Sequence, residues 1–285
     1  MPITAVGMID HPEQARNVQQ WLYRSIGMAR TYSMDRRAYM KTVGALGATT
    51  AIAGCSSSEE NTETIVPGTN SGFPPFEYTE DGELVGFDIE LAETVIDRAG
   101  YEVGEWQDIA FESLIPSVLD GDIDLIAAGM TIGPDRQEQI DFTDPYWESS
   151  QAVLVQEGGE FQPESVEDLE GVRVGAQGGT TGEGEAEALV EDGLVAEDDL
   201  RRYDNYTLAA QDLENGNVDA VIVDEPVAGS FAGDRAVAIA FVIDTGEQFG
   251  MGMRPDDERL SDLNDALAEL RDDGTYDELV GEWFE

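Results

Sequence analysis

The stretch Leu-Asp-Gly-Asp-Ile-Asp-Leu-Ile at residues 119–126 has the pattern of a helix end, a glycine turn and a buried strand. A similar stretch, Leu-Glu-Asn-Gly-Asn-Val-Asp-Ala-Val-Ile, occupies residues 213–222. Each predicted strand continues into a polar segment, 129–136 in the first case and 224–226 in the second. Helices that alternate with parallel strands form α/β sheets, and ligands bind beyond the carboxyl ends of such strands. The repeat therefore predicts two similar α/β lobes, with both polar segments at a binding site.

The remaining predicted elements fit this alternation of strands and helices. The segment Leu84–Gly100 is predicted to be a strand end followed by a helix that stops at Gly100. Apolar runs predict strands at residues 64–68, 123–128, 172–176, 218–223 and 237–243. Apolar residues at helical spacing predict further helices at 111–120, around 186–190, and at 260–270 and 276–283.

The composition is that of a strongly acidic folded protein. The chain has 285 residues, enough for two small domains, and a formal net charge of −46. Hydrophobic residues make up 41% of the chain and fall in ordered runs, which argues against a disordered acidic chain. Because so much negative charge repels phosphates, we expect no nucleic-acid partner.

Basic and reactive residue types are almost absent. Lys41, His11 and Cys55 are the single lysine, histidine and cysteine. From Cys55 onward the chain has nine arginines and 58 of the 61 acidic residues, which gives this part a formal charge of −49. This balance resembles that of proteins from salt-accumulating archaea. Without a second cysteine, or any lysine or histidine past Cys55, the mature chain has no catalytic triad, Schiff base, disulfide or His/Cys zinc site, and we expect no metal and no cofactor.

Residues 34–54 resemble a twin-arginine lipoprotein signal peptide. Arg36-Arg37 precede the apolar stretch Thr42–Ala53, and Ala51–Cys55 resembles a lipobox whose cysteine thiol becomes the lipid attachment point. The apolar run of about twelve residues is too short for a bilayer, which needs roughly twenty. We therefore expect a lipid anchor at Cys55 on the outer face of the cytoplasmic membrane. A short buried helix with a chance cysteine is the alternative.

The residues on either side of this signal have their own interpretations. Residues 55–63 are polar and are predicted to be a tether. Residues 1–33 fit no export scheme, and Met34 is a natural start directly before the signal. We interpret 1–33 as the product of a start codon assigned too far upstream, with an extended signal n-region as the alternative.

Most of the mature sequence resembles the polar amino-acid-binding class (family 3) of ABC-transporter solute-binding proteins. The resemblance implies a two-lobed α/β periplasmic-binding-protein (Venus flytrap) fold with two hinge strands. Lobe 1 would comprise residues 64–150 and 248–285, and lobe 2 residues 151–247. It also implies a monomer without catalytic activity that binds a free amino acid and delivers it to an ABC transporter permease. The matching segments are 68–76, 86–91, 124–145, 171–181, 219–225 and 272–284.

The resemblance assigns the backbone groups of the ligand to four residues. Arg136 matches an arginine that binds the α-carboxylate, for which a planar guanidinium offers two charge-assisted hydrogen bonds. Asp224 matches the aspartate that receives the α-ammonium. Thr180 and Thr181 follow two glycines and match carboxylate-binding residues, where a helix N-terminus favours anions.

Other matched positions surround the ligand. Gly129 and Thr131 match positions that contribute backbone and hydroxyl hydrogen bonds. Phe73 matches an aromatic residue that stacks on the ligand side chain, whereas Phe76 is either a second wall of the site or part of the core. Asn70 stands where binders of cationic amino acids often have aspartate.

The expected ligand side chain is therefore polar and uncharged, similar to that of glutamine. An amide at Asn70 with the apolar faces of Phe73 and Met130 suits an apolar stem with a hydrogen-bonding tip. A cationic ligand would require Glu112 or Glu183 to turn toward the pocket.

Three other functions remain open at this point. An enzyme on the same fold, such as a dehydratase, would use Glu112 or Glu225 as general acid or base. The sensing domain of a receptor is expected to carry a transmembrane or signalling segment, which does not follow the lobes here. A lytic glycosidase would need a pair of catalytic carboxylates, and none stands out.

The charge balance predicts that folding depends on salt. Repulsion among the carboxylates of the mature chain opposes compaction, and dissolved salt screens that repulsion. The melting temperature, followed by circular dichroism, should therefore fall markedly after dialysis from concentrated KCl into low salt. An unchanged melting temperature would contradict the interpretation as a halophilic protein.

Overall fold

The structure, a computed structural model, describes residues 62–284. The predicted signal peptide at 34–54, the predicted lipid-attachment residue Cys55 and residues 1–33 lie outside this range. A search of the described part of the chain finds no helix that is both long and apolar enough to cross a bilayer.

The first of two five-stranded sheets draws its strands from both ends of the described chain. Its strand order is β6-β2-β7-β14-β8. β2 runs parallel to β6 and β7, whereas β14 is antiparallel to β7 and β8, so the sheet is mixed. The bounds are β2 (Pro67–Thr69), β6 (Gln107–Asp108), β7 (Leu125–Ile126), β8 (Asp141–Phe142) and β14 (Gly252–Met253).

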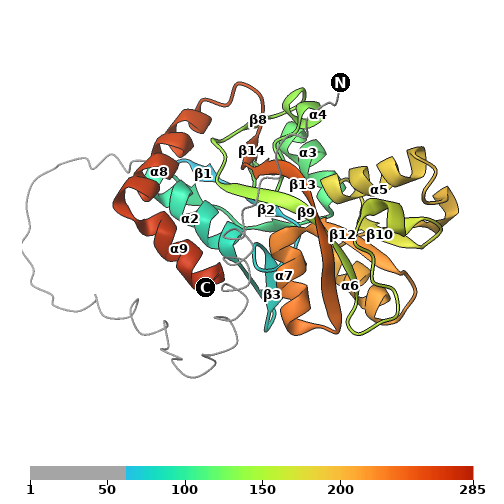
Figure 1. The fold of residues 1–285 in the computed structure, drawn as a ribbon. Helices are drawn as coiled ribbons and strands as arrows, with labels where there is room; N and C mark the ends of the chain where they lie inside the picture. Colours follow the sequence, from blue (N-terminus) through green and yellow to red (C-terminus); the bar gives the residue numbers. More distant parts are fainter. Residues whose placement is uncertain (1–61, 285) are drawn as a thin grey trace, which may run out of the picture. The chain divides into compact units, whose positions relative to one another are not determined.

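Helices cover this sheet, and we call sheet and helices together the first lobe. α2 buries Leu91 and Val95, four residues apart on one face, and ends at Gly100 in the left-handed conformation, as the sequence predicts. α8 and α9 pack beside α2 (Figure 1). The bounds are α2 (Phe87–Ala99), α3 (Phe111–Asp120), α4 (Pro134–Gln137), α8 (Arg259–Asp273) and α9 (Thr275–Phe284).

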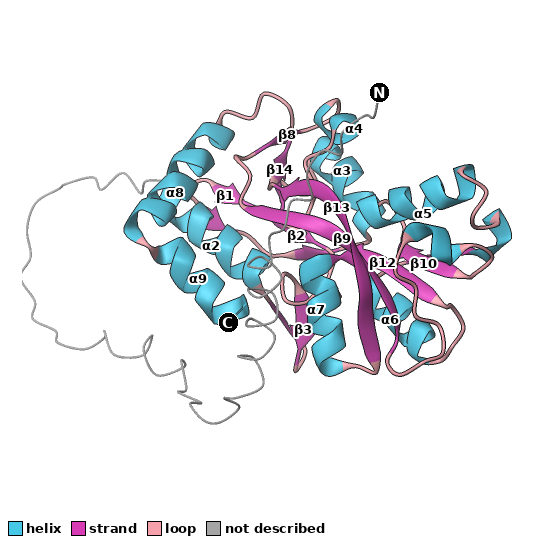
Figure 2. Ribbon diagram, viewed as in Figure 1, coloured by secondary structure: helices cyan, strands magenta, loops and turns pink. Residues whose placement is uncertain are grey.

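The second sheet, with the helices that pack on it, forms the second lobe (Figure 2). Its strand order is β11-β10-β12-β9-β13, with β10 parallel to β11 and β12, and with β9 antiparallel to β12 and β13. The strands are β9 (Trp147–Gln156), β10 (Val174–Gln177), β11 (Leu200–Tyr203), β12 (Ala220–Asp224) and β13 (Val237–Phe249). The helices are α5 (Thr181–Glu191), α6 (Tyr206–Glu214) and α7 (Glu225–Asp234).

Small elements complete the two lobes. β1 pairs with β5 in parallel, β3 and β4 form a hairpin, and two short 3₁₀ helices lie in the second lobe. Their bounds are β1 (Thr64–Ile65), β3 (Tyr78–Glu80), β4 (Glu83–Val85), β5 (Glu102–Val103), η2 (Val166–Leu169) and η3 (Glu197–Asp199).

The internal repeat is confirmed. α3 leads through Gly121 into β7, and α6 leads through Gly216 into β12. Both strands are central in their sheets and pair in parallel with a neighbouring strand, β2 in one lobe and β10 in the other. The strand predicted at residues 123–128 is shorter than expected, because only Leu125–Ile126 pair as a strand.

Two long strands, β9 and β13, link the lobes. β13 extends beyond the predicted end at residue 243, because its antiparallel pairing with β9 continues to Phe249 opposite Trp147. At that end Phe249 also forms a bridge with Thr131 of the first lobe. The expected lobe boundaries at 150/151 and 247/248 fall within these two strands, which are the hinge strands of the fold.

Candidate ligand-binding site

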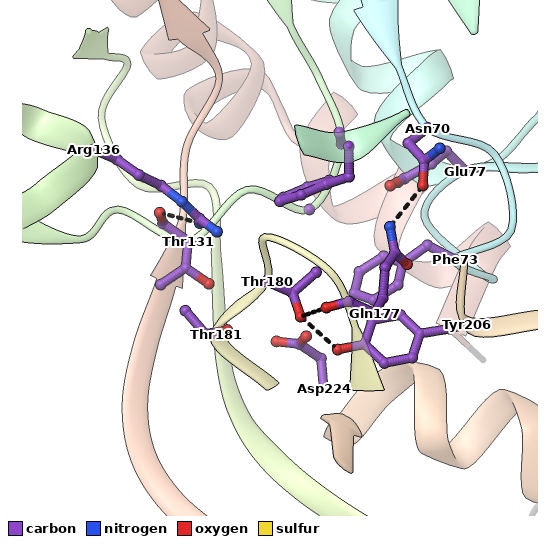
Figure 3. A pocket seen from close by; sticks show the side chains of 13 residues that line it. Asn70, Phe73, Glu77, Thr131, Arg136, Gln177, Thr180, Thr181, Tyr206 and Asp224 are labelled. Atoms are coloured by element: carbon purple, nitrogen blue, oxygen red, sulfur yellow. Dashed lines mark hydrogen bonds between the residues drawn. The ribbon is translucent and has the colours of Figure 1, made fainter. Parts of the chain in front are cut away.

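A pocket lies where the two lobes face each other. Asn70 directly follows β2, Gln177 ends β10 and Asp224 ends β12, so the carboxyl ends of strands from both sheets meet here (Figure 3). The first lobe contributes Asn70, Phe73, Glu77, Phe111, Ala128, Gly129, Thr131 and Arg136. The second lobe contributes Gln177, Thr180, Thr181, Tyr206 and Asp224.

Phe76 is a predicted site residue that the structure places in the core instead. It is fully buried and does not line the pocket. Its ring contacts an aromatic cluster near the hinge strands, formed by Phe87, Trp147, Phe249 and Phe284. Burial of a phenylalanine side chain contributes about 1.5–3 kcal/mol, which explains an aromatic residue here without a ligand. Phe73, by contrast, lines the pocket with its ring centroid 5.7 Å from that of Tyr206.

Arg136 is the arginine that lines the pocket. Its Nη1 donates to the carbonyl of Thr131 at 2.8 Å, and its Nη2 donates to the carbonyl of Gly179 in the other lobe at 3.0 Å. A guanidinium has five N–H donors, so others remain for a ligand carboxylate. The guanidinium also lies 5.4 Å from the centre of the Phe111 ring. Burial lowers the pKa of Arg136, and the nearby acids Asp224 and Glu247 act against that shift.

Asp224 presents a buried carboxylate to the same pocket. Its side chain is 3% exposed, and Oδ1 accepts a hydrogen bond from Ser149 Oγ at 3.1 Å. Burial, with repulsion from Glu247, raises the pKa of Asp224 to about 7. Since no ion pair within residues 62–284 involves Asp224, this carboxylate can receive a ligand ammonium.

Glu77 also lines the pocket, and the sequence interpretation missed it. Its side chain is 1% exposed, and Oε2 has no hydrogen-bond partner among the described residues. Burial raises the pKa of Glu77 well above its usual value, and the charges of Asp88 and Asp224 raise it further. Figure 3 places Glu77 beside Asn70, across the pocket from Arg136. Its position directly after Phe76, four residues from the pocket aromatic Phe73, was the available signal.

The hydroxyl of Thr180 forms its hydrogen bonds within the protein, whereas the carboxylate contact predicted from the sequence relies on the backbone N–H groups of a helix N-terminus. It donates to the carbonyl of Gln177 at 2.8 Å and accepts the backbone N–H of Glu183 at 3.2 Å, which caps α5. The Tyr206 hydroxyl lies 2.9 Å away and must donate, because the single proton of Thr180 is already used. One donor and two acceptor positions are thus occupied, and this hydroxyl has none left for a ligand carboxylate.

Gly129 forms part of the pocket wall and is fixed by Asp88. Its N–H donates to Asp88 Oδ2 at 2.7 Å, and its φ of 52° lies in the left-handed region. A Cβ atom at this position would lie 2.5 Å from Cε1 of Phe73, so the absence of a side chain at Gly129 leaves room for that ring. Asp88 also accepts the hydroxyl of Tyr146. Burial raises the pKa of Asp88 to about 6, and these hydrogen bonds act against the shift.

Asn70 is part of a hydrogen-bonded contact between the lobes. Its Nδ2 donates to the carbonyl of Ile109 at 2.8 Å, and its Oδ1 accepts from Gln177 Nε2 at 2.8 Å. The two glutamates that were considered for a cationic ligand do not line the pocket. Glu183 forms an ion pair with Arg202, and Glu112 is exposed.

Phe111, Ala128, Gln177 and Tyr206 also line the pocket without having been predicted. Gln177 could have been found by the strand-end argument that identified Asp224. Tyr206 begins α6 directly after its cap residue Asn205, a position with no sequence signal for a pocket. Within residues 62–284 no group of three or more His, Cys, Asp or Glu side chains is arranged to hold a metal ion.

Two lobes, two hinge strands and a pocket with one arginine and two buried carboxylates define a solute-binding protein. The pattern of the family described as "Bacterial extracellular solute-binding proteins, family 3" matches residues 65–285, and the chain belongs to this family. It is accordingly a binding protein and not an enzyme.

Individual relatives agree with this family and fold. The arginine-binding extracellular protein ArtP of Bacillus subtilis (strain 168) is 34% identical over 245 residues, which cover 83% of this chain and 93% of the relative. An ancestral arginine-binding protein bound to arginine has a TM-score of 0.73 and 38% identity, over 78% of this chain and 98% of that chain. The structure of an ancestral arginine-binding protein bound to glutamine has a TM-score of 0.72 and 38% identity, over 78% of this chain and 97% of that one.

Proposed function

We propose that this protein captures an α-amino acid with a cationic side chain, arginine foremost, and delivers it to the permease of an ABC transporter. The observation that carries the choice of side chain is Glu77, a buried carboxylate in the pocket with an unpartnered oxygen. The broader function, amino-acid binding for an ABC transporter, was predicted from the sequence and is confirmed by the family and its members.

Charge balance favours a cationic ligand. Arg136 can bind the α-carboxylate and Asp224 the α-ammonium, which leaves Glu77 for the side chain. A buried charge is costly unless an opposite charge pairs with it. A guanidinium at Glu77 supplies that opposite charge, whereas a glutamine side chain supplies none.

The positions of the charged groups support the same assignment. Arg136 and Glu77 lie on opposite sides of the pocket, so a ligand held by its carboxylate at Arg136 extends its side chain toward Glu77 (Figure 3). The relatives ArtP and the ancestral protein, named for arginine, add support for this side chain.

Glutamine remains the second candidate. The sequence interpretation favoured it because of Asn70, and the amides of Asn70 and Gln177 do lie at the pocket, hydrogen-bonded to each other. The related ancestral protein bound to glutamine shows that this family accommodates such a side chain. The two candidates differ in whether Glu77 requires a positive charge.

Replacement of Glu77 distinguishes them. Glu77→Gln should weaken arginine binding by roughly 30-fold or more, because loss of one partner of a buried charge pair costs about 2–5 kcal/mol. Glutamine binding should stay equal or improve, since no buried carboxylate then lacks a cation. Isothermal titration calorimetry with both amino acids measures the two effects, and an unchanged arginine affinity would contradict the proposal.

Two variants serve as controls for this experiment. Glu80→Gln removes one exposed negative charge three residues away and should leave both affinities unchanged. Arg136→Ala should abolish binding of both ligands, because it removes the carboxylate partner that they share. The melting temperature of Glu77→Gln should not fall, since glutamine has a similar size and burial already disfavours the charged form of Glu77.

For the parts of the chain outside residues 62–284, we propose export by a twin-arginine signal and lipid anchoring at Cys55. The sequence of 34–55 supports this, with paired arginines, an apolar stretch and a lipobox in order. The acidic, lysine-poor composition supports a haloarchaeal type of protein. We further propose that it acts as a monomer at the outer face of the cytoplasmic membrane, with lobe boundaries at 150/151 and 247/248.

The anchor has a direct test. Mass spectrometry of the membrane fraction of the natural host should find a lipid-modified cysteine at the N-terminus and no peptide from residues 1–33. Recovery of an intact chain that begins at Met1 would show that the proposed processing does not occur.

A further inference from the structure

Glu247 is the centre of a hydrogen-bond network that joins both lobes beside the pocket. It lies near the end of the hinge strand β13, is partly buried, and does not itself line the pocket. Its Oε2 accepts hydrogen bonds from Thr131 Oγ1 at 2.9 Å, Thr181 Oγ1 at 2.9 Å and Gln151 Nε2 at 3.2 Å. Thr131 belongs to the first lobe, whereas Thr181 begins α5 of the second.

The direction of these bonds determines what the two hydroxyls can offer a ligand. A threonine hydroxyl has one proton and two lone pairs, and a carboxylate can only accept. Thr131 and Thr181 therefore both direct their protons toward Glu247. Both residues line the pocket, where their hydroxyls can act only as acceptors.

An acceptor in this position matches the α-ammonium of an amino acid and not its α-carboxylate. Thr131 and Thr181 lie between Arg136 and Asp224 in the pocket, at the end where the backbone groups of the ligand would bind (Figure 3). The carboxylate is then left to the guanidinium of Arg136 and to backbone N–H groups. This differs from the role that the sequence resemblance implied for Thr181.

We propose that Glu247 is a positioning residue that holds the Thr131 and Thr181 hydroxyls as hydrogen-bond acceptors for the ligand α-ammonium. Gln151 supports this arrangement, because its Nε2 bonds to both Glu247 and Thr181. The inference rests on the proposed function only in that the ligand is an α-amino acid. It does not depend on the charge of the ligand side chain.

A double-mutant cycle with arginine and glutamine tests this role. Glu247→Gln should weaken both ligands by a similar factor, on the order of tenfold, because a neutral amide oxygen is a weaker acceptor for the two hydroxyls than a carboxylate, and the amide N–H would face Nε2 of Gln151. In a Thr131→Val/Thr181→Val background the same substitution should change affinity by less than about threefold, since no hydroxyl is left to orient. Full additivity of the two losses would show that Glu247 does not act through these hydroxyls and would overturn the proposal.

An analogue of arginine without the α-amino group, 5-guanidinopentanoic acid, provides a second readout. Its affinity should be nearly insensitive to Glu247→Gln, and a loss equal to that for arginine would contradict a role toward the ammonium. If its binding is too weak to measure, the cycle with arginine decides alone. Asp244→Asn, an exposed acid on the same strand, is the matched control and should leave every affinity unchanged, with melting temperatures confirming that all variants fold.

These outcomes are separate from the test of Glu77. A failure of the arginine proposal would appear as an unchanged arginine affinity in Glu77→Gln. A failure of the Glu247 proposal would appear as additivity in the cycle, whichever amino acid binds more tightly.

Discussion

The binding site depends on the burial of more negative than positive charge. Glu77, Asp88 and Asp224 are all buried in or beside the pocket, and burial raises the pKa of each carboxyl. Among residues 62–284, Arg136 is the single arginine that lines the pocket. Because an unpaired buried charge is costly, burial in the free protein favours the neutral form of these carboxyls. A ligand that brings two positive groups and one negative group relieves this imbalance, and arginine has that set of charges.

The hinge strands relate this electrostatic imbalance to domain closure. A ligand favours the closed form only if it binds that form better, through contacts to both lobes. Arg136 and Glu77 come from the first lobe, and Asp224 comes from the second. The network around Glu247, on the hinge strand β13, joins the same two lobes. The hydrogen bonds of Arg136 to Gly179 and of Gln177 to Asn70 also join the two lobes. The protein thus supplies some closing contacts itself and leaves the charged ones to the ligand.

Repeated local patterns explain why much of the fold could be predicted from the sequence. The glycine turns at Gly121 and Gly216, and the helix stop at Gly100, depend on neighbours in sequence and were correctly placed. Asp224 was assigned from the resemblance to the family, and its position at a predicted strand end supported that assignment. Contacts between distant segments have no such signal. Phe73 and Phe76 look alike in sequence. Only the structure shows that Phe73 lines the pocket, whereas Phe76 packs against the aromatic cluster near the hinge strands. Glu77 and Glu247 lie outside the polar segments, and segments far along the chain form the surroundings that give them their roles.

The central claim is that Glu77, whose pKa in the free protein is raised by burial and by nearby carboxylates, pairs with the ligand side chain in the complex. Pairing with a cation lowers the pKa of Glu77, so arginine binding should release the proton of this group. Glutamine binding releases no proton from Glu77, although both ligands affect Asp224 alike. Calorimetry at slightly acidic pH in buffers of different ionisation enthalpy measures the protons released. The account predicts a release for arginine that exceeds the release for glutamine by up to about one proton. Equal release for the two ligands would contradict it.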